Sequence, residues 1–168
     1  IRLRGTIGPE HRIYVFNSLH GRETAVEFDA HKLSPVLNTR EDIEFWSGYA
    51  QNGGRSNTVI EIDTGMNRLG LSPPEAEKIA EDAGLLAPLS LDFVMSHLAC
   101  ADEAADPMNE KQRQLFDKLI SLFPDVPASL ANSGGIFLGP GYHHDIARPG
   151  AALYGISEAT GASEPMQQ

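Results

Sequence analysis

The chain has 168 residues, 41% of them hydrophobic and 21% charged, which is enough for one globular domain with a hydrophobic core. Its formal net charge of -10 and isoelectric point near 4.9 argue against a nucleic-acid or anionic-membrane surface, because both would repel it. Cys100 is the only cysteine, so no disulfide can form within the chain, as is typical of proteins in a reducing compartment.

From the sequence we expect neither a membrane-spanning helix nor a signal peptide. No apolar run approaches the ~20 residues that a membrane-spanning helix requires. The chain starts at Ile1 without a charged and then apolar segment. We therefore expect a soluble, cytoplasmic protein. Because the first residue is isoleucine rather than methionine, we also expect the chain to be a piece of a longer protein.

The first half of the chain alternates between strand and helix patterns. We predict a strand at 12–16, a helix at 24–33 and a strand at 35–37. The next helix has Asn38 or Thr39 as its cap and acidic residues in its first turn, and it stops at 52–54. A strand at 58–63 follows.

The second half repeats this alternation. A helix begins with a capping box at Ser72 and Glu75 and ends near Gly84. We then predict a strand at 91–97, a helix at 109–123, a strand at 128–131 and one or two strands within 146–156. Short connections between alternating strands and helices indicate parallel pairing through right-handed crossovers. A doubly wound sheet and a (β/α)8 barrel both remain open, although no GxGxxG turn supports a dinucleotide-binding form of the first.

Function in parallel α/β folds gathers at the carboxyl ends of the strands. The polar residues and glycines that follow the predicted strands are Asp63, Arg68, His97, Asn132, Ser133, Gly134, Gly135, Arg148 and Gly150. The run 132–135 enters a helix start, where free N–H groups and glycines can receive an anion. An ordinary helix cap explains the same run. Gly150 in the next loop favours a phosphorylated ligand, because barrel phosphate sites often use the last two strand-end loops.

Several of these residues also have simpler explanations. A lone histidine such as His97 is more often packed or solvated than functional, and Arg148 can pair with Asp145. His143 and His144 are adjacent in a loop, and no carboxylate spacing supports them as metal ligands, so we predict no metal site.

Four segments in order resemble the alanine racemases and cover essentially the whole chain. They are EIDTGMNRLG at 61–70, HLACADE at 97–103, SLANSGG at 129–135 and RPGAALYG at 148–155. The resemblance implies an N-terminal (β/α)8 barrel that holds pyridoxal 5′-phosphate (PLP) and a C-terminal β-rich domain. It also implies a head-to-tail homodimer that interconverts L- and D-alanine and supplies D-alanine for peptidoglycan.

The resemblance implies a role for each matching residue. His97 should lie against the pyridine ring of PLP, and Arg148 should meet the pyridine nitrogen. A guanidinium that stays charged disfavours protonation of this nitrogen, which makes the ring a poorer electron sink. Arg68 should reach the phenolic oxygen of PLP and the substrate carboxylate. The residues expected around the phosphate are Asn132, Ser133, Gly150 and Ala151.

Glu61 departs from the family pattern. Many members have a lysine there, often carbamylated and therefore anionic. We hypothesise that Glu61 supplies the carboxylate directly and orients Arg68 by a charge-assisted hydrogen bond, which leaves Asp63 to the turn after the strand. The alternative is that Glu61 faces solvent as an ordinary polar strand residue.

The two bases of the family's reaction have no counterpart here. One is a lysine that binds PLP covalently, and the other is a tyrosine from the partner subunit. The four lysines of this chain all fall on predicted helices: Lys32, Lys78, Lys111 and Lys118. We therefore expect residues 1–156 to form a partial PLP-binding barrel without its first strands, and 157–168 to be a polar tail leading to an absent C-terminal domain.

Such a fragment should be inactive on its own. It should also have unpaired sheet edges and an uncovered apolar interior. Two other functions remain open: a related PLP-barrel racemase of serine or of broad specificity, and a non-catalytic PLP- or phosphate-binding module.

Overall fold

A computed structural model describes residues 2–16 and 21–156 of the chain. The strands are β1 (Ile13–Val15), β2 (Leu33–Leu37), β3 (Asn57–Glu61), β4 (Ser90–Met95) and β5 (Ala128–Ser129). The α-helices are α1 (Arg2–Ile7), α2 (Gly21–Ala30), α3 (Arg40–Gln51), α4 (Pro73–Glu81), α5 (Ala83–Leu86), α6 (Pro107–Ile120) and α7 (Ser133–Phe137). Two 3-10 helices follow, η1 (Pro140–Tyr142) and η2 (Ala151–Tyr154).

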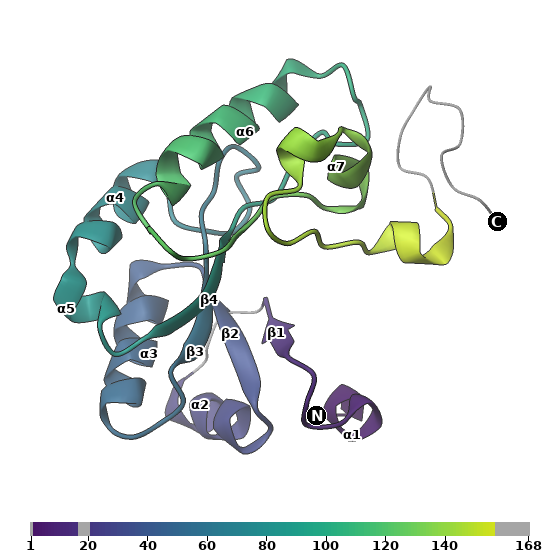
Figure 1. Cartoon of the computed structure of the whole chain (residues 1–168). Coiled ribbons are helices and arrows are strands. Elements are labelled where there is room, and N and C mark those ends of the chain that lie inside the picture. The colour runs from purple at the N-terminus through teal and green to yellow at the C-terminus, as the bar shows by residue number, and fades with distance from the viewer. Residues whose placement is uncertain (1, 17–20, 157–168) are drawn as a thin grey trace.

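The five strands form one parallel sheet in the order β1-β2-β3-β4-β5 (Figure 1). Each strand pairs with its neighbour in the sequence, and at least one helix connects every successive pair. A doubly wound sheet reverses its strand order at a switch point, and the described sheet has no such reversal. The order is that of consecutive strands in a (β/α)8 barrel, so the partial barrel is the architecture that fits.

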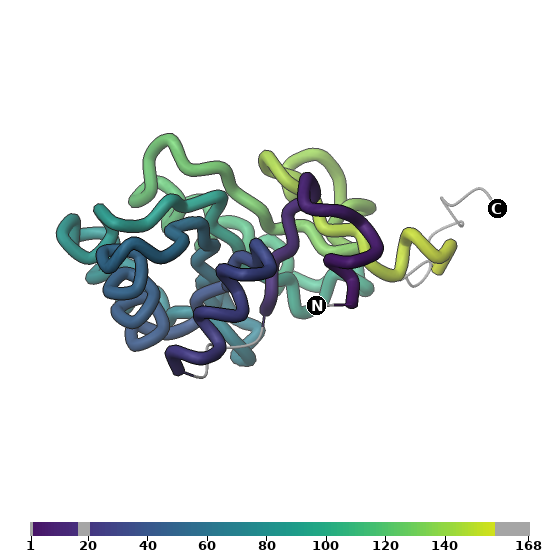
Figure 2. Tube along the Cα trace, turned by 90° about the horizontal axis from the view of Figure 1, so that it is seen from below, coloured from purple at the N-terminus to yellow at the C-terminus, as the bar shows by residue number. Residues whose placement is uncertain are grey.

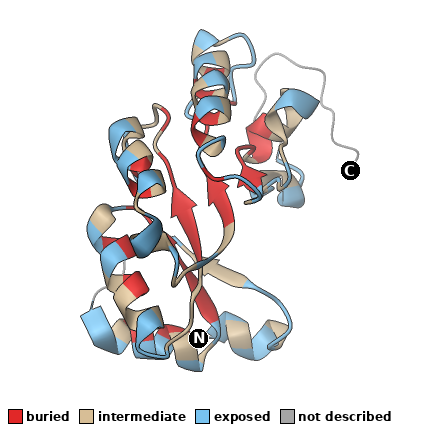
Figure 3. Ribbon diagram, turned by 60° about the vertical axis from the view of Figure 1, so that its left-hand side comes forward, coloured by how far each residue is buried: buried red, intermediate tan, exposed pale blue. Residues whose placement is uncertain are grey.

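The larger core lies between the sheet and the helices that pack on its outer side (Figures 1 and 3). Its largest fully buried side chain is Trp46 on α3, which stacks on Tyr49 and meets Phe28 of α2 edge to face. Phe116 and Leu119 of α6 are also fully buried in this core. Helical spacing of the apolar residues therefore places one face of each longer helix against the strands.

A smaller core lies on the inner side of the sheet. Val36, Val59, Phe93 and Met95 are at most 4% exposed, and Tyr14 and Ile146 pack against them. Our prediction of an uncovered interior is therefore wrong for these residues. The cause is the segment around Ile146, which returns along β5 and donates its N–H to the Ala128 carbonyl at 3.1 Å. Figure 2 shows the late part of the chain (yellow-green) on the side of the molecule opposite α3.

Several element boundaries follow the local signals in the sequence. Thr39 caps α3 by accepting a hydrogen bond from the Asp42 N–H, and the predicted capping box at Ser72 and Glu75 is present. The helix expected to end at Gly84 instead ends at Glu81, because the Asp82 side chain caps a new helix, α5.

Two other predictions are wrong. Residues 146–156 contain no strand: Pro149 and Gly150 interrupt the segment, and η2 follows. Lys32 lies in a turn with φ of +51° rather than on a helix. The predicted tail, 157–168, lies outside the described residues. Among the described helices, none is long and apolar enough to cross a membrane.

Candidate functional site

Three strand-end segments and one returning segment meet at the carboxyl edge of the sheet. Because the strands are parallel, the turn after β3, the loop after β4 and the start of α7 after β5 lie at the same edge. The returning segment brings Arg148, whose backbone N–H donates to the Ala131 carbonyl at 2.9 Å. A cavity of about 380 Å³ lies here, lined among others by Met66, His97, Asp102 and Asn132.

The guanidinium of Arg148 is held in place by hydrogen bonds that it donates to the ends of β4 and β5. It donates to the Ser129 hydroxyl, to the Ser96 carbonyl and, at 3.4 Å, to the Leu130 carbonyl. Burial lowers the pKa of Arg148 to about 10, and the negative charge of Glu61 opposes this shift. The group therefore remains a cation at neutral pH, held in one orientation.

His97 presents a neutral imidazole to the cavity. Its Nε2 lies 3.3 Å from Nδ2 of Asn132, whose Oδ1 accepts from the Gly135 N–H and so fixes the orientation of the amide. The amide therefore donates to Nε2, and the ring proton resides on Nδ1. That nitrogen is buried and has no hydrogen-bond partner in the described structure. Burial, reinforced by the positive charges of Arg148 and Arg68, lowers the pKa of His97 to about 4.

The start of α7 is joined to the returning segment by one hydroxyl. Ser133 Oγ accepts from the backbone N–H of Gly150 at 2.8 Å and of Ala152 at 3.2 Å. Ala151, between them, begins η2. The Ser133 hydroxyl still carries its own proton, and a hydroxyl at a helix start is a donor type that binds phosphate oxygens.

Glu61 at the end of β3 is buried rather than solvent-facing, with only 3% of its surface exposed. Its Oε2 has no partner among the described residues. Burial raises the pKa of Glu61, and the nearby charges of Arg148 and then Arg68 counteract this shift. Arg68 itself is exposed, and the ion pairs found in the described residues do not join it to Glu61.

The turn that carries Arg68 is built by Asp63 and Gly70. Asp63 Oδ1 accepts from the N–H groups of Gly65 and Asn67, at 2.8 and 3.1 Å, as expected for a carboxylate that serves the turn. The turn closes where the Asp63 N–H donates to the Leu71 carbonyl at 2.8 Å. Gly70 has a φ of +104° and lies against the backbone of residues 61–63, where a side chain would collide.

The two adjacent histidines, His143 and His144, do not line this cavity. His144 contacts Asp117 at 2.8 Å, and His143 lies 2.9 Å from the Ile136 carbonyl. Asp145 accepts from the Ala128 N–H rather than pairing with Arg148. Within the described residues, no three His, Cys, Asp or Glu side chains gather in a way that suits a metal ion.

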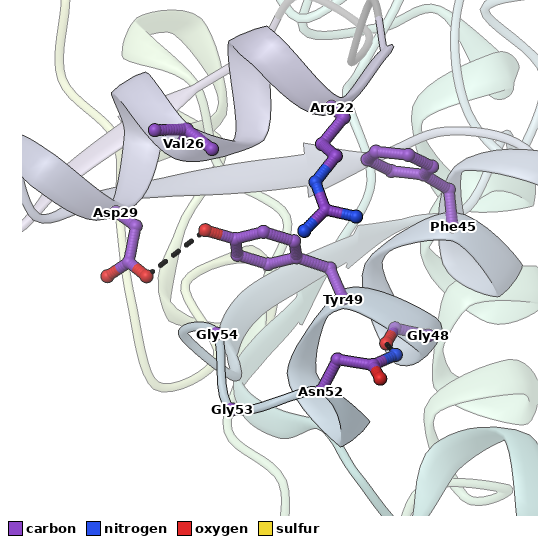
Figure 4. A pocket seen from close by; sticks show the side chains of 9 residues that line it. All are labelled: Arg22, Val26, Asp29, Phe45, Gly48, Tyr49, Asn52, Gly53 and Gly54. Atoms are coloured by element: carbon purple, nitrogen blue, oxygen red, sulfur yellow. Dashed lines mark hydrogen bonds between the residues drawn. The ribbon is translucent and has the colours of Figure 1, made fainter.

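A second cavity, of about 390 Å³, lies between α2 and α3 in the outer layer (Figure 4). Tyr49 dominates it, with its hydroxyl donating to Asp29 at 3.2 Å and Arg22 beside its ring. Its lining includes none of the candidate residues from the sequence. The carboxyl edge of the sheet is therefore the candidate site.

The sequence analysis missed four polar residues that support this edge. They are Thr64, Ser96, Gln112 and Ser129, all of them buried. Thr64, Ser96 and Ser129 are small residues in or just after strands, where no periodic signal separates them from core positions. The one signal for Gln112 is that a polar residue shares the buried face of the helix with Phe116 and Leu119.

The family is evident from sequence comparison. A family model described as "Alanine racemase, N-terminal domain" matches residues 1–158. A protein named "Alanine racemase, catabolic" from Mesorhizobium japonicum is 47% identical over 168 residues, which is 99% of this chain and 44% of that protein. An alanine racemase from Rhizobium meliloti is 44% identical over 95% of this chain and 42% of its own length.

Solved structures agree with the sequence matches. A crystal structure of alanine racemase from Bartonella henselae with covalently bound pyridoxal phosphate has a TM-score of 0.89 at 30% identity. It is matched over 98% of this chain and 47% of that one. The biosynthetic alanine racemase from Pseudomonas aeruginosa has a TM-score of 0.81 at 27% identity, over 96% of this chain and 44% of that one. The chain spans less than half the length of these relatives, and it belongs to the alanine racemase family, whose N-terminal domain it matches.

Proposed function

We propose that the protein to which this chain belongs is a PLP-dependent racemase that interconverts L- and D-alanine. The support is the 47% and 44% identity to proteins named alanine racemases, together with a site edge that carries His97, Arg148 and Ser133. The alternatives, a racemase of serine or broad specificity and a module without catalysis, are not favoured by these relatives.

The residues at the carboxyl edge fit a phosphorylated pyridine. Two buried polar atoms there lack partners in the described chain, Nδ1 of His97 and Oε2 of Glu61, and such atoms indicate a place for a polar ligand. When bound, PLP would supply an electron-withdrawing ring that stabilises negative charge at the α-carbon of alanine. His97, Asn132, Ser133, Arg148, Gly150 and Ala151 are the residues that would hold it.

Arg148 would set the electronic state of the pyridine nitrogen. Its donors are held by Ser129, Ser96 and Leu130, so the cation cannot turn away from the ring without breaking these hydrogen bonds. A guanidinium does not give up its proton at neutral pH, so it would keep the pyridine nitrogen unprotonated. His97 is neutral chiefly because burial lowers its pKa, and the positive charges of Arg148 and Arg68 lower it further.

Glu61 would act as the fixed anion behind Arg68. Its burial, and its electrostatic interaction with both Arg148 and Arg68, support a role inside the site rather than at the surface. In the full-length protein, Glu61→Gln should lower the affinity for PLP or raise the KM for alanine severalfold. Glu77→Gln, which removes a carboxylate from an exposed ion pair with Lys118, is the matched control. Equal kinetics for both variants would reject the role of Glu61.

Inversion of the α-carbon needs one base on each face of the substrate. None of the four lysines lies at the carboxyl edge of the sheet: Lys32 is in a turn, Lys78 is on α4, and Lys111 and Lys118 are on α6. The lysine and tyrosine bases would therefore come from other parts of the full-length protein and from a second subunit of a cytoplasmic homodimer. The chain alone should be inactive.

The decisive experiment uses the full-length gene product. Purified with PLP, it should convert L-alanine to D-alanine, with D-alanine detected by chiral chromatography, and convert L-serine more slowly. The 168-residue chain is the matched control and should give no D-alanine. A full-length protein that binds PLP but racemises neither amino acid would leave only the non-catalytic module. Faster conversion of serine would favour the related racemase instead.

A further inference from the structure

Gln112 is a fully buried amide on α6 that contacts two loops of the candidate site. Its Nε2 donates to the His97 carbonyl at 2.9 Å and to the Thr64 hydroxyl at 3.2 Å. Its Oε1 accepts from the Ala99 N–H at 2.8 Å. The side chain is 0% exposed, so these contacts are made without competition from water.

These hydrogen bonds connect the loop after β4 with the turn after β3. Ala99 and His97 belong to the first, and Thr64 begins the turn that carries Arg68. The network continues from Thr64 to the Ser96 hydroxyl at 2.7 Å, and the Ser96 carbonyl accepts from Arg148. One side chain on a helix is thus linked to the segments that carry both arginines and the histidine.

A buried amide costs free energy unless its donors and acceptor are satisfied. An apolar residue would fill this buried position on α6 without that cost, as Phe116 does about one helical turn further along. Packing alone therefore does not account for Gln112. Because Gln112 forms hydrogen bonds with both loops, it fixes the distance between the two loops. A leucine at this position could not fix that distance, because it forms no hydrogen bonds through its side chain.

We propose that Gln112 is a positioning residue for the cofactor site, acting through His97 and the Thr64–Arg68 turn. Its hydrogen bonds fix the position of the His97 backbone at the sheet edge. They also hold the turn that carries Arg68 at a fixed distance from His97. The inference rests on the proposed function, because the ligand it prepares the site for is PLP.

The test measures PLP affinity of the full-length protein, stripped of cofactor, by absorbance titration. Gln112→Leu should weaken PLP binding about tenfold, because one to two buried hydrogen bonds that place His97 are lost. Asn109→Leu is the matched control on α6: Asn109 is also buried and donates to the carbonyls of Cys100 and Glu103, farther along the same loop. Both variants should unfold at lower temperature, but only Gln112→Leu should lose PLP affinity.

A second variant, Gln112→Glu, keeps the acceptor for Ala99 and loses the donors while its carboxyl is ionised. Its PLP affinity, divided by that of the unsubstituted protein, should be low at about pH 8.5 and should recover as the pH falls and the carboxyl regains a proton. This variant decides the question if Gln112→Leu does not fold. Equal losses in Gln112→Leu and Asn109→Leu, or a pH-independent ratio for Gln112→Glu, would overturn the inference. Failure of the unsubstituted protein to bind PLP would instead overturn the proposed function.

Discussion

The Ser133 hydroxyl accepts hydrogen bonds from the N–H groups of both Gly150 and Ala152, so one oxygen joins the start of α7 to the returning segment. Ser133→Ala removes this link and should lower the free energy of unfolding by about 1 kcal/mol. If Ser133 donates to the phosphate as proposed, the substitution should also weaken PLP binding by the full-length protein about tenfold. Denaturant unfolding and absorbance titration measure the two effects separately.

Ser121→Ala provides the control for that prediction. The Ser121 hydroxyl donates to the Lys118 carbonyl at 2.7 Å, but Ser121 lies exposed at the end of α6. Its replacement should leave PLP affinity unchanged. If Ser121→Ala and Ser133→Ala weakened PLP binding equally, the phosphate role of Ser133 would be wrong.

Arg148 should stabilise the fold as well as the site. Arg148→Gln leaves the Ser129 hydroxyl and the Ser96 carbonyl without a charged donor, and it leaves Glu61 without the positive charge that affects it most. We expect a loss of about 2 kcal/mol in the free energy of unfolding. Denaturant unfolding of both single variants and of the double variant with Glu61→Gln gives the coupling energy. Strictly additive losses would show that Glu61 and Arg148 do not interact.

The fold was largely predictable because its signals are local. The cap at Thr39, the capping box at Ser72 and the alternation of strands and helices depend on residues close together in the sequence. The strand predicted within 146–156 is absent because Pro149 and Gly150 interrupt the segment, and several N–H groups after them donate to carbonyls within the same segment. The N–H groups of Ile146 and Arg148 donate instead to the carbonyls of Ala128 and Ala131. No local pattern indicates that a segment will return along another strand.

The sequence indicated several residues that the structure brings together, but it did not indicate their contacts. The motifs indicated His97, Asn132, Ser133 and Arg148, and these side chains do gather at one sheet edge. The charge of Arg148 affects the pKa of Glu61 more than the charge of Arg68 does. This difference depends on how deeply each side chain is buried, which the sequence does not show. The support from Gln112 was missed for the same reason.

His97 makes the stability of the chain depend on pH. Its folded-state pKa of about 4 lies below the ordinary value of 6.5, so the unfolded chain binds the proton more readily. The contribution of His97 is therefore fully present above pH 6.5 and is lost as the pH falls from 6.5 to about 4, by at most about 3 kcal/mol. In denaturant unfolding from about pH 7.5 to about pH 4, His97→Gln should lose less stability on acidification than the unsubstituted chain.

The control for this pH effect is His11→Gln. His11 is an exposed histidine beside Glu10, so solvent surrounds its side chain and the substitution should change the pH profile much less. If His97→Gln and the unsubstituted chain lost the same stability over this pH range, the imidazole of His97 would have to titrate alike in the folded and unfolded chains. The neutral state assigned to it would then be wrong.

Gly70 and Gly48 should respond in opposite ways to the same substitution. A Cβ at Gly70 would lie 2.8 Å from the Asp63 nitrogen, and its φ of +104° is unfavourable for any side chain. Gly70→Ala should therefore lower the free energy of unfolding by about 2 kcal/mol and displace the turn of Arg68. Gly48 lies within α3, where a Cβ would point into open space, so Gly48→Ala should raise the free energy of unfolding by up to ~1 kcal/mol. Denaturant unfolding checks both values, and a neutral Gly70→Ala would contradict the tight closure of this turn.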